Sequence, residues 1–221
     1  MHSFTAPIGT NNNGNTVEVE INQTDLAHGI IFGRTGCGKS IALATLLSNL
    51  SEKYTSEDIE IVYLSGNHPT SSINALPLTT HVFSKEQTQE AIEYLRSVIE
   101  ERMTYANDNE LTAISTANLP AIIVAVENSS EELTEMLQTL TSIGRSLGIH
   151  LILVRQTTYP STLPHDIAQM FGWALAFEEP ANLSLKWTHE MIKDAPKATG
   201  EAVFATKDAS TFVKVFDTLA Q

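Results

Sequence analysis

The fold of this 221-residue chain is decided by one stretch, Gly33-Arg34-Thr35-Gly36-Cys37-Gly38-Lys39-Ser40. The stretch matches G-x-x-x-x-G-K-[ST] at every fixed position. Its glycines let the backbone wrap an anion with N–H groups at a helix N-terminus, where the helix dipole favours negative charge. In such a loop Lys39 reaches the terminal phosphates and the Ser40 hydroxyl holds a magnesium ion. We therefore predict that residues 33–40 form a phosphate loop for ATP and Mg²⁺.

The segments on either side of the loop supply the context that the pattern requires. An apolar run, residues 29–32, reads as a buried strand entering the loop. After the loop, Ile41, Ala44, Leu47 and Leu50 recur at helical spacing, which predicts an amphipathic helix over residues 39–54. A glycine-rich turn that binds nothing is the alternative. This alternative is weak as an account of the strand–loop–helix structure. It is stronger as an argument that no nucleotide is bound, because family members can keep such a loop after they have lost nucleotide binding.

Apolar strand patterns alternate with helical ones along the rest of the chain. A capping box of Ser84 and Gln87 predicts a long helix with an apolar stripe of Ile92, Leu95, Ile99 and Met103. Ser129 with Glu132 predicts a second helix, which Gly148 ends. Strands are predicted at residues 17–21, 59–64, 81–83, 121–126, 150–154 and 173–177, with a closing hairpin at 202–205 and 211–216. This order predicts a three-layer α/β P-loop NTPase fold with a mostly parallel central sheet and an antiparallel edge hairpin.

Composition narrows the possible functions. The length suits one large domain, and the single cysteine, Cys37, excludes disulfide-stapled and zinc-module proteins. Twenty-six acidic residues against 13 basic ones give a net charge of −13, which disfavours nucleic acid as a partner. No apolar run approaches the length of a bilayer span, and the N-terminus lacks the apolar stretch of a signal peptide.

The expected catalytic acids are incomplete. Phosphoryl transfer to water needs a carboxylate near magnesium and a second one to orient the water, usually consecutive acids after a buried strand. The buried strand at 121–126 is followed by Glu127 and Asn128, where Asp and Glu are usual. Glu127 carries its oxygens roughly 1.5 Å further than Asp would, and Asn128 cannot accept a proton. Losing a general base costs about 100- to 10,000-fold in rate. The weaker alternative places the working acids elsewhere, for example at Glu178 and Glu179.

Several segments together carry a family resemblance. Residues 27–40, AHGIIFGRTGCGKS, resemble the loop of the FtsK/SpoIIIE-type motor ATPases, whose common form is TGSGKS. Residues 142–153 are similar to the segment joining that family's acidic strand to its sensor strand, and Gln156 stands where the family keeps a sensor glutamine. Residues 76–103 also follow the family pattern. Within the family, the chain looks most like the degenerate C-terminal ATPase domain of the EssC/EccC component of type VII secretion systems.

Departures from the family pattern concern hydrolysis more than fold. The family commonly has Asp and Lys after its second strand, where residues 64–67 read Leu-Ser-Gly-Asn. The strand at 173–177 lacks the arginine that DNA-translocating members carry. The resemblance thus implies that residues 1–221 are a single domain cut from a longer, membrane-anchored bacterial chain, lying in the cytoplasm. It also implies partners: neighbouring ATPase domains, small WXG-type secreted helical hairpins, and further copies in a hexamer, with no nucleic acid.

Three functions follow. The first is a substrate-recognition or regulatory domain that binds nucleotide with weak or absent hydrolysis, so the metal site would rest on Ser40 and Glu127. The second is an active motor domain whose site is completed by a neighbouring protomer. The third, disfavoured by charge, is a DNA translocase. Whether the chain is an enzyme stays open at this stage.

For four further side chains the sequence gives only weak indications of a role. Cys37 lies near a helix N-terminus that can lower the pKa of a thiol, but a plain replacement for the serine of TGSGKS is the favoured interpretation. Arg145 could contact nucleotide or a neighbouring domain, or simply complement a helix dipole. We expect His28 and His150 to be packed and not catalytic.

Overall fold

A computed structural model gives the structure of the protein and describes residues 3–66, 71–114, 119–127, 130–156, 164–178, 192, 195–196 and 198–217. Its strands are β1 (Ser3–Thr10), β2 (Thr16–Asn22), β3 (Gly29–Gly33), β4 (Ile59–Leu64), β5 (Thr79–Phe83), β6 (Ala121–Glu127), β7 (Ile149–Gln156), β8 (Trp173–Ala176), β9 (Glu201–Thr206) and β10 (Ser210–Val215). Its helices are α1 (Lys39–Lys53), α2 (Ser71–Asn74), α3 (Thr88–Asp108), α4 (Thr134–Ile143) and α5 (His165–Ala168), with 3₁₀ turns η1 (Lys85–Gln87), η3 (Glu131–Leu133) and η4 (Gly144–Leu147).

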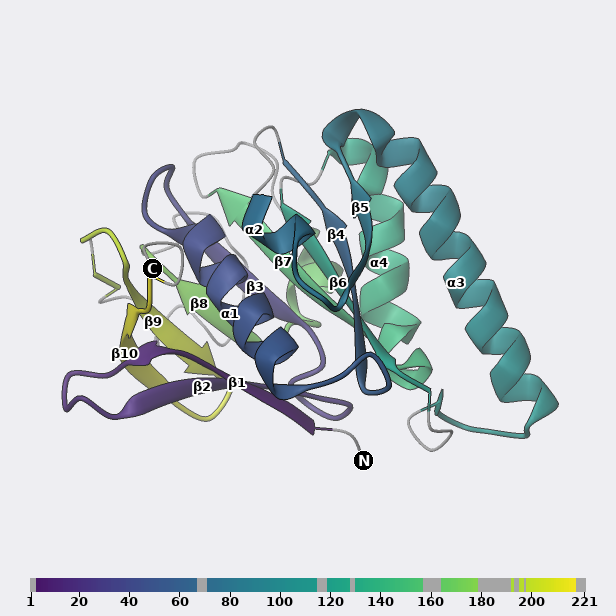
Figure 1. The fold of residues 1–221 in the computed structure, drawn as a ribbon, viewed down its shortest axis with the longest axis horizontal. Helices are drawn as coiled ribbons and strands as arrows, with labels where there is room; N and C mark the ends of the chain where they lie inside the picture. The colour runs from purple at the N-terminus through teal and green to yellow at the C-terminus, as the bar shows by residue number, and fades with distance from the viewer. Residues whose placement is uncertain are drawn as a thin grey trace.

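The strands form one ten-stranded sheet in the order β2-β1-β10-β9-β8-β3-β7-β6-β4-β5. From β8 to β5 neighbouring strands run parallel, so their carboxyl ends meet at one edge of the sheet. From β8 to β2 every pairing is antiparallel. The predicted hairpin at 202–205 and 211–216 is confirmed as β9 and β10, and the N-terminal hairpin of β1 and β2 extends it (Figure 1).

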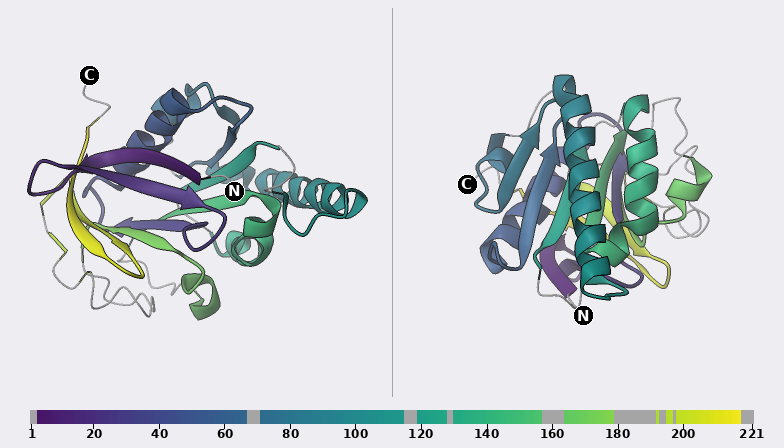
Figure 2. Two further views of the ribbon diagram at one scale, coloured as in Figure 1. Left: turned by 90° about the horizontal axis from the view of Figure 1, so that it is seen from below. Right: turned by 90° about the vertical axis from the view of Figure 1, so that its right-hand side faces the viewer.

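Strand alternation divides the core into two layers. One face of the sheet packs with α1 and α2, and the other packs with α3, α4 and α5. Figure 2 shows α3 and α4 side by side on their face. In β6, Ala121, Ile123 and Ala125 face α1, whereas Ile122, Val124 and Val126 face α3 and α4. The predicted three-layer α/β architecture with a mostly parallel sheet is confirmed.

The helix after the phosphate loop differs from the prediction. We predicted an amphipathic helix with one solvent face, but α1 is buried over most of its surface, from Ala42 through Leu47 and at Leu50, while Ile41 of the predicted stripe is half-buried. The sheet curls around the helix, so that Phe4, Ala6 and Val19 of the N-terminal hairpin share its core layer. Two apolar surfaces therefore cover α1.

The long helix α3 begins as predicted and ends differently. The Ser84 N–H donates to Gln87 Oε1 at 3.1 Å, and the capping box is present. It closes the turn η1, from which α3 continues. Met103 does not complete the stripe, because 46% of it is exposed. Arg102 is buried instead, and its guanidinium donates to the Leu147 carbonyl at 2.9 Å and to the Pro120 carbonyl at 2.6 Å. These bonds tie α3 to η4 and to the segment that enters β6.

The predicted cap of the next helix lies at Ser129, outside the described residues. The described chain shows Ser130 as the N-cap of η3, which leads into α4, and Gly148 ends η4 in the left-handed conformation as predicted. Among the described helices, none combines the length and apolarity needed to cross a bilayer.

Candidate nucleotide-binding site

The phosphate loop runs from the end of β3 to the first turn of α1, as predicted. Gly38 has φ 113°, a conformation that L side chains rarely adopt. A Cβ at Gly33 would lie 2.8 Å from Cys37 Sγ and 2.8 Å from Phe177 Cβ, so the close approach of β8 requires glycine there. Both fixed glycines of the pattern therefore have a structural reason.

Neighbouring elements fasten this loop from behind. The Gly200 N–H donates to the Cys37 carbonyl at 2.9 Å, and the Phe177 N–H donates to the Phe32 carbonyl at 3.0 Å. At the front, Arg34, Thr35, Gly36 and Ser40 are exposed. The loop is thus hydrogen-bonded to neighbouring segments on one side, and its exposed residues lie at a helix N-terminus, which favours an anion.

Lys39 is held across the loop. Its side chain is buried, and its Nζ donates to the Arg34 carbonyl at 2.7 Å. Burial lowers the pKa of Lys39, while the charges of Cys37, Glu178 and Glu127 oppose that shift. A partly desolvated ammonium at this position is suited to a strong contact with phosphate.

Cys37 is not the activated thiol that the helix N-terminus suggested. It is 2% exposed, and burial raises the pKa of its thiol although the Lys39 charge acts in the opposite direction. Of the two alternatives for Cys37, the structure supports the plain replacement for serine, because desolvation of the thiolate outweighs the nearby positive charge. Cys37 serves as a small apolar side chain in the core layer beneath the loop.

Glu127, the last residue of β6, lies on the α1 face of the sheet and is 7% exposed. Its Oε2 accepts a hydrogen bond of 2.5 Å from the Tyr63 hydroxyl on β4. Its Oε1 is buried and has no hydrogen-bond partner among the described residues. Asn128, the second half of the predicted acidic pair, lies outside the described residues.

Gln156, the predicted sensor, is the last residue of β7 and is exposed. Gly33 pairs with Gln156 across β3 and β7, and Glu127 pairs with Val154 across β6 and β7. Because Ile152 and Val154 face α1, the alternation places Gln156 on that face too. The structure therefore brings the loop, Glu127 and Gln156 to one edge and one face of the sheet.

The donors at this edge fit a magnesium ion held mainly by nucleotide. Mg²⁺ usually takes one or two protein oxygens together with phosphates and waters. Ser40 offers an exposed hydroxyl and Glu127 an unpartnered carboxylate oxygen. Within the described ranges no group of three His, Cys, Asp or Glu could hold a metal by itself.

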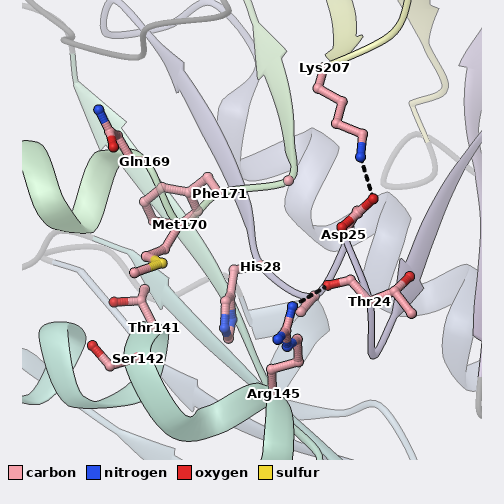
Figure 3. A pocket seen from close by; sticks show the side chains of 12 residues that line it. Thr24, Asp25, His28, Thr141, Ser142, Arg145, Gln169, Met170, Phe171 and Lys207 are labelled. Atoms are coloured by element: carbon pink, nitrogen blue, oxygen red, sulfur yellow. Dashed lines mark hydrogen bonds and ion pairs between the residues drawn. The ribbon is translucent and has the colours of Figure 1, made fainter.

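Arg145 and the two histidines lie at the opposite edge, where β3, β7 and β8 begin. Arg145 Nη1 donates to the Thr24 carbonyl at 3.2 Å beside a hollow of about 450 Å³ (Figure 3). Contact between Arg145 and nucleotide bound at the loop of the same domain is therefore excluded. His28 accepts from the Leu151 N–H at 3.0 Å, and burial lowers the pKa of His28 to about 3 and that of His150 to about 4. Both are packed, as expected.

Sequence reasoning missed two residues near the loop. Tyr63 is the one aromatic side chain of β4, a signal visible in Ile-Glu-Ile-Val-Tyr-Leu, but nothing in that pattern paired it with Glu127. Glu178 follows β8 and influences Lys39; it was considered only as a weak alternative acid. The sheet register that joins β4 to β6 and β8 to β3 was needed to place them.

The family model described as FtsK/SpoIIIE matches residues 1–119, which include the loop and α1. The chain belongs to the FtsK/SpoIIIE family. A curated relative, the ESX secretion system protein YukB of Bacillus subtilis (strain 168), is 30% identical over 139 residues, covering 56% of this chain. The ESX secretion system protein EccC of Geobacillus thermodenitrificans (strain NG80-2) is 28% identical, also over 139 residues and 56% of this chain. The match covers 9% of each relative.

Solved structures agree on the fold of this FtsK/SpoIIIE member. The cytoplasmic domain of the type VII secretion ATPase EccC of Thermomonospora curvata superposes with a TM-score of 0.79 at 16% identity, covering 96% of this chain and 28% of the other. EccC ATPases 2 and 3 from the same organism, in complex with a signal sequence peptide, give 0.67 at 18%, covering 96% and 40%. The pCW3 conjugation coupling protein TcpA with ATPγS gives 0.69 at 15%, covering 96% and 66%.

Proposed function

We propose that this chain is a degenerate P-loop ATPase domain of a type VII protein secretion motor, one that binds ATP with Mg²⁺, hydrolyses it slowly or not at all, and acts in substrate recognition and coupling. One observation carries the proposal. A complete phosphate loop lies at the same sheet edge as a strand that ends in Glu127, already hydrogen-bonded to Tyr63, with Asn at position 128.

Binding rests on the loop. Backbone N–H groups of residues 33–40 would surround the phosphates, Lys39 would contact the terminal phosphates, and Ser40 with Glu127 would hold the magnesium ion. Bound Mg²⁺ would neutralise phosphate charge. The relative TcpA was solved with ATPγS, which supports nucleotide binding in this fold.

Slow hydrolysis follows from the second region. A water attacking the terminal phosphate needs a group that orients it and accepts its proton, and the amide of Asn128 cannot accept one. Glu127 has one carboxylate oxygen bonded to Tyr63, which leaves the other for the cation. We therefore expect turnover about 100- to 10,000-fold below that of a complete site.

The substrate role is supported by relatives. ESX secretion proteins match in sequence, and EccC ATPases 2 and 3 were solved with a signal sequence peptide. We propose that this domain belongs to a longer membrane-anchored bacterial chain on its cytoplasmic side. There it would contact neighbouring ATPase domains and a WXG-type secreted protein, with hexamer formation by the full chain. The charge of −13 argues against nucleic acid as a partner.

The test joins three measurements on one preparation. Calorimetric titration with ATP and Mg²⁺ should give saturable binding that Lys39→Ala weakens, and phosphate release should stay at background. A C-terminal peptide of a WXG-type protein should bind the domain, and a scrambled peptide should not. Fast turnover, or no peptide binding, would contradict the corresponding half of the proposal.

A second candidate, an active motor domain, is favoured by Glu178. Its negative charge acts on Lys39 more strongly than that of Glu127, so a second carboxylate does lie near the loop. In this alternative Glu178, or a residue from a neighbouring protomer, would supply the missing base. Turnover that depends on Glu178 or on protein concentration would favour it.

A further inference from the structure

We infer that Tyr63 is a positioning residue, whose hydroxyl holds the Glu127 carboxylate so that its second oxygen is kept for the magnesium ion of a bound nucleotide. The inference rests on the proposed nucleotide binding and names the residue that sets its dependence on Mg²⁺.

The sheet brings the two side chains together. β4 and β6 are adjacent and parallel, and Tyr63 pairs with Ala125, two residues before Glu127. Residues two apart on a strand share a face, so Tyr63 and Glu127 both lie on the α1 face. The phenol reaches along the strand to Glu127 Oε2, with 2.5 Å between the oxygens.

Burial makes this hydrogen bond consequential. Tyr63 is 0% exposed and Glu127 is 7% exposed, so neither group can rely on water. A buried carboxylate is costly unless its oxygens have partners. Tyr63 satisfies Oε2, whereas Oε1 is buried with no partner among the described residues. An unsatisfied carboxylate oxygen in a buried position is a ready acceptor for a cation or its bound water.

The bond also answers a problem created by the sequence. Glu127 carries one methylene more than an Asp would at the end of β6, and this methylene adds a rotatable bond between backbone and carboxylate. A freely rotating carboxylate would spend less time in the orientation that binds the ion. Tyr63 removes that freedom, because rotation of Glu127 would break a charge-assisted hydrogen bond.

Partners of metal ligands tune affinity without touching the metal, and losing one typically costs 10- to 100-fold in metal affinity. Tyr63→Phe deletes the hydroxyl and keeps the ring. We expect the Mg²⁺ concentration for half-maximal binding of a fluorescent ATP analogue to rise about 10-fold. Binding of the same analogue in EDTA should change less than about twofold, because the loop and Lys39 are untouched.

Tyr54→Phe is the matched control. Tyr54 packs against the same core layer, and its hydroxyl accepts a 3.0 Å hydrogen bond from the Thr5 N–H, far along α1 from the loop. It should leave the Mg²⁺ dependence unchanged. In a Glu127→Gln background, Tyr63→Phe should add little, because the carboxylate that it positions is gone.

The outcomes separate this inference from the proposed function. An unchanged Mg²⁺ midpoint in Tyr63→Phe, or an equal loss of binding with Mg²⁺ and with EDTA, overturns the inference alone. No analogue binding by the unmodified protein overturns the proposed function and the inference with it. If Tyr63→Phe does not fold, the inference can be tested instead with 3-fluorotyrosine at position 63 of the otherwise unmodified chain, observed by ¹⁹F NMR. Its ¹⁹F signal should shift when Mg²⁺ is added to the nucleotide-bound protein, and a constant signal overturns the inference.

Discussion

The phosphate loop and the end of β6 lie at the same edge of the sheet, but only the loop has all the residues that are usual at its position in an ATPase. The loop has each fixed residue of its pattern, a fastened backbone and a buried lysine. The end of β6 has a lengthened acid held by a tyrosine, followed by an asparagine. We propose that nucleotide binding depends on the first region and turnover on the second, so that the two activities can be lost separately.

Repairing the second region gives the largest expected effect. The double substitution Glu127→Asp and Asn128→Glu restores the usual acidic pair, and we expect it to raise ATP turnover about 100- to 10,000-fold, the usual contribution of a general base. Phosphate release under saturating ATP measures it. Glu52→Asp is the control, because it alters an exposed acid near the far end of α1 from the loop. A repaired variant as slow as the unmodified chain would show that the end of β6 is not what limits turnover.

Damaging the first region comes next. Lys39→Ala removes the ammonium that would contact phosphate, and charge-assisted contacts contribute about 1.5–3 kcal/mol, so affinity for ATP should fall roughly 10- to 150-fold. Lys53→Ala, at the far end of the same helix, should leave affinity unchanged. Calorimetry checks both variants. Equal affinities for Lys39→Ala and the unmodified chain would show that ATP does not bind at the phosphate loop.

The two buried histidines lie at the edge of the sheet opposite the phosphate loop, and they make stability depend on pH. The pKa values of His28 and His150 are lowered to about 3 and about 4, from about 6.5 in the unfolded chain. The unfolded state therefore binds more protons below pH 6.5. The free energy of unfolding should be highest with respect to these two groups above pH 6.5 and should fall as the pH drops toward 4. The slope is at most about 1.4 kcal/mol per pH unit for each histidine.

Urea unfolding at pH 7 and pH 5 measures this loss. His150→Gln should reduce the difference between the two values, whereas His81→Gln, at an exposed position on β5, should not. Equal stability of the unmodified chain at both pH values would contradict the burial of the two imidazoles.

The smallest expected effect concerns Glu178. Its charge lies close enough to raise the pKa of Lys39 against burial, so it should also repel a phosphate at the loop. Glu178→Gln should tighten ATP binding by about two- to fivefold, a typical size for a partly screened charge pair. The active-motor alternative predicts instead a loss of turnover in this variant. Binding and phosphate release measured together distinguish the two.

The strand, loop and helix at the centre of the fold could be predicted from the sequence because the patterns that indicate them are local. The glycine spacing of residues 33–40 and the apolar run before it predict a strand, loop and helix without knowledge of distant residues. β1 was not predicted, since Pro7 and Gly9 interrupt its pattern and a register shift lies between them. Its pairing with β2 and β10 depends on segments far away in the chain.

The site was predicted in parts for the same reason. Glu127 and Gln156 were identified as strand-end residues, and the register brings both to the loop edge. Tyr63 could not be paired with Glu127 before the adjacency of β4 and β6 was known. One cause explains both the rejected alternative of an activated Cys37 and the unexpected burial of α1. The local sequence pattern indicates a helix terminus or a periodicity, but it does not indicate how far distant segments exclude water from that place.

We propose that this domain binds ATP and Mg²⁺ without efficient hydrolysis. The most direct measurement is one calorimetric titration with ATP and Mg²⁺, followed by phosphate release from the same sample. We predict saturable binding with release at least about 100-fold slower than in the E127D/N128E variant. Release by the unmodified chain as fast as in that variant, and abolished by Lys39→Ala, would contradict the claim.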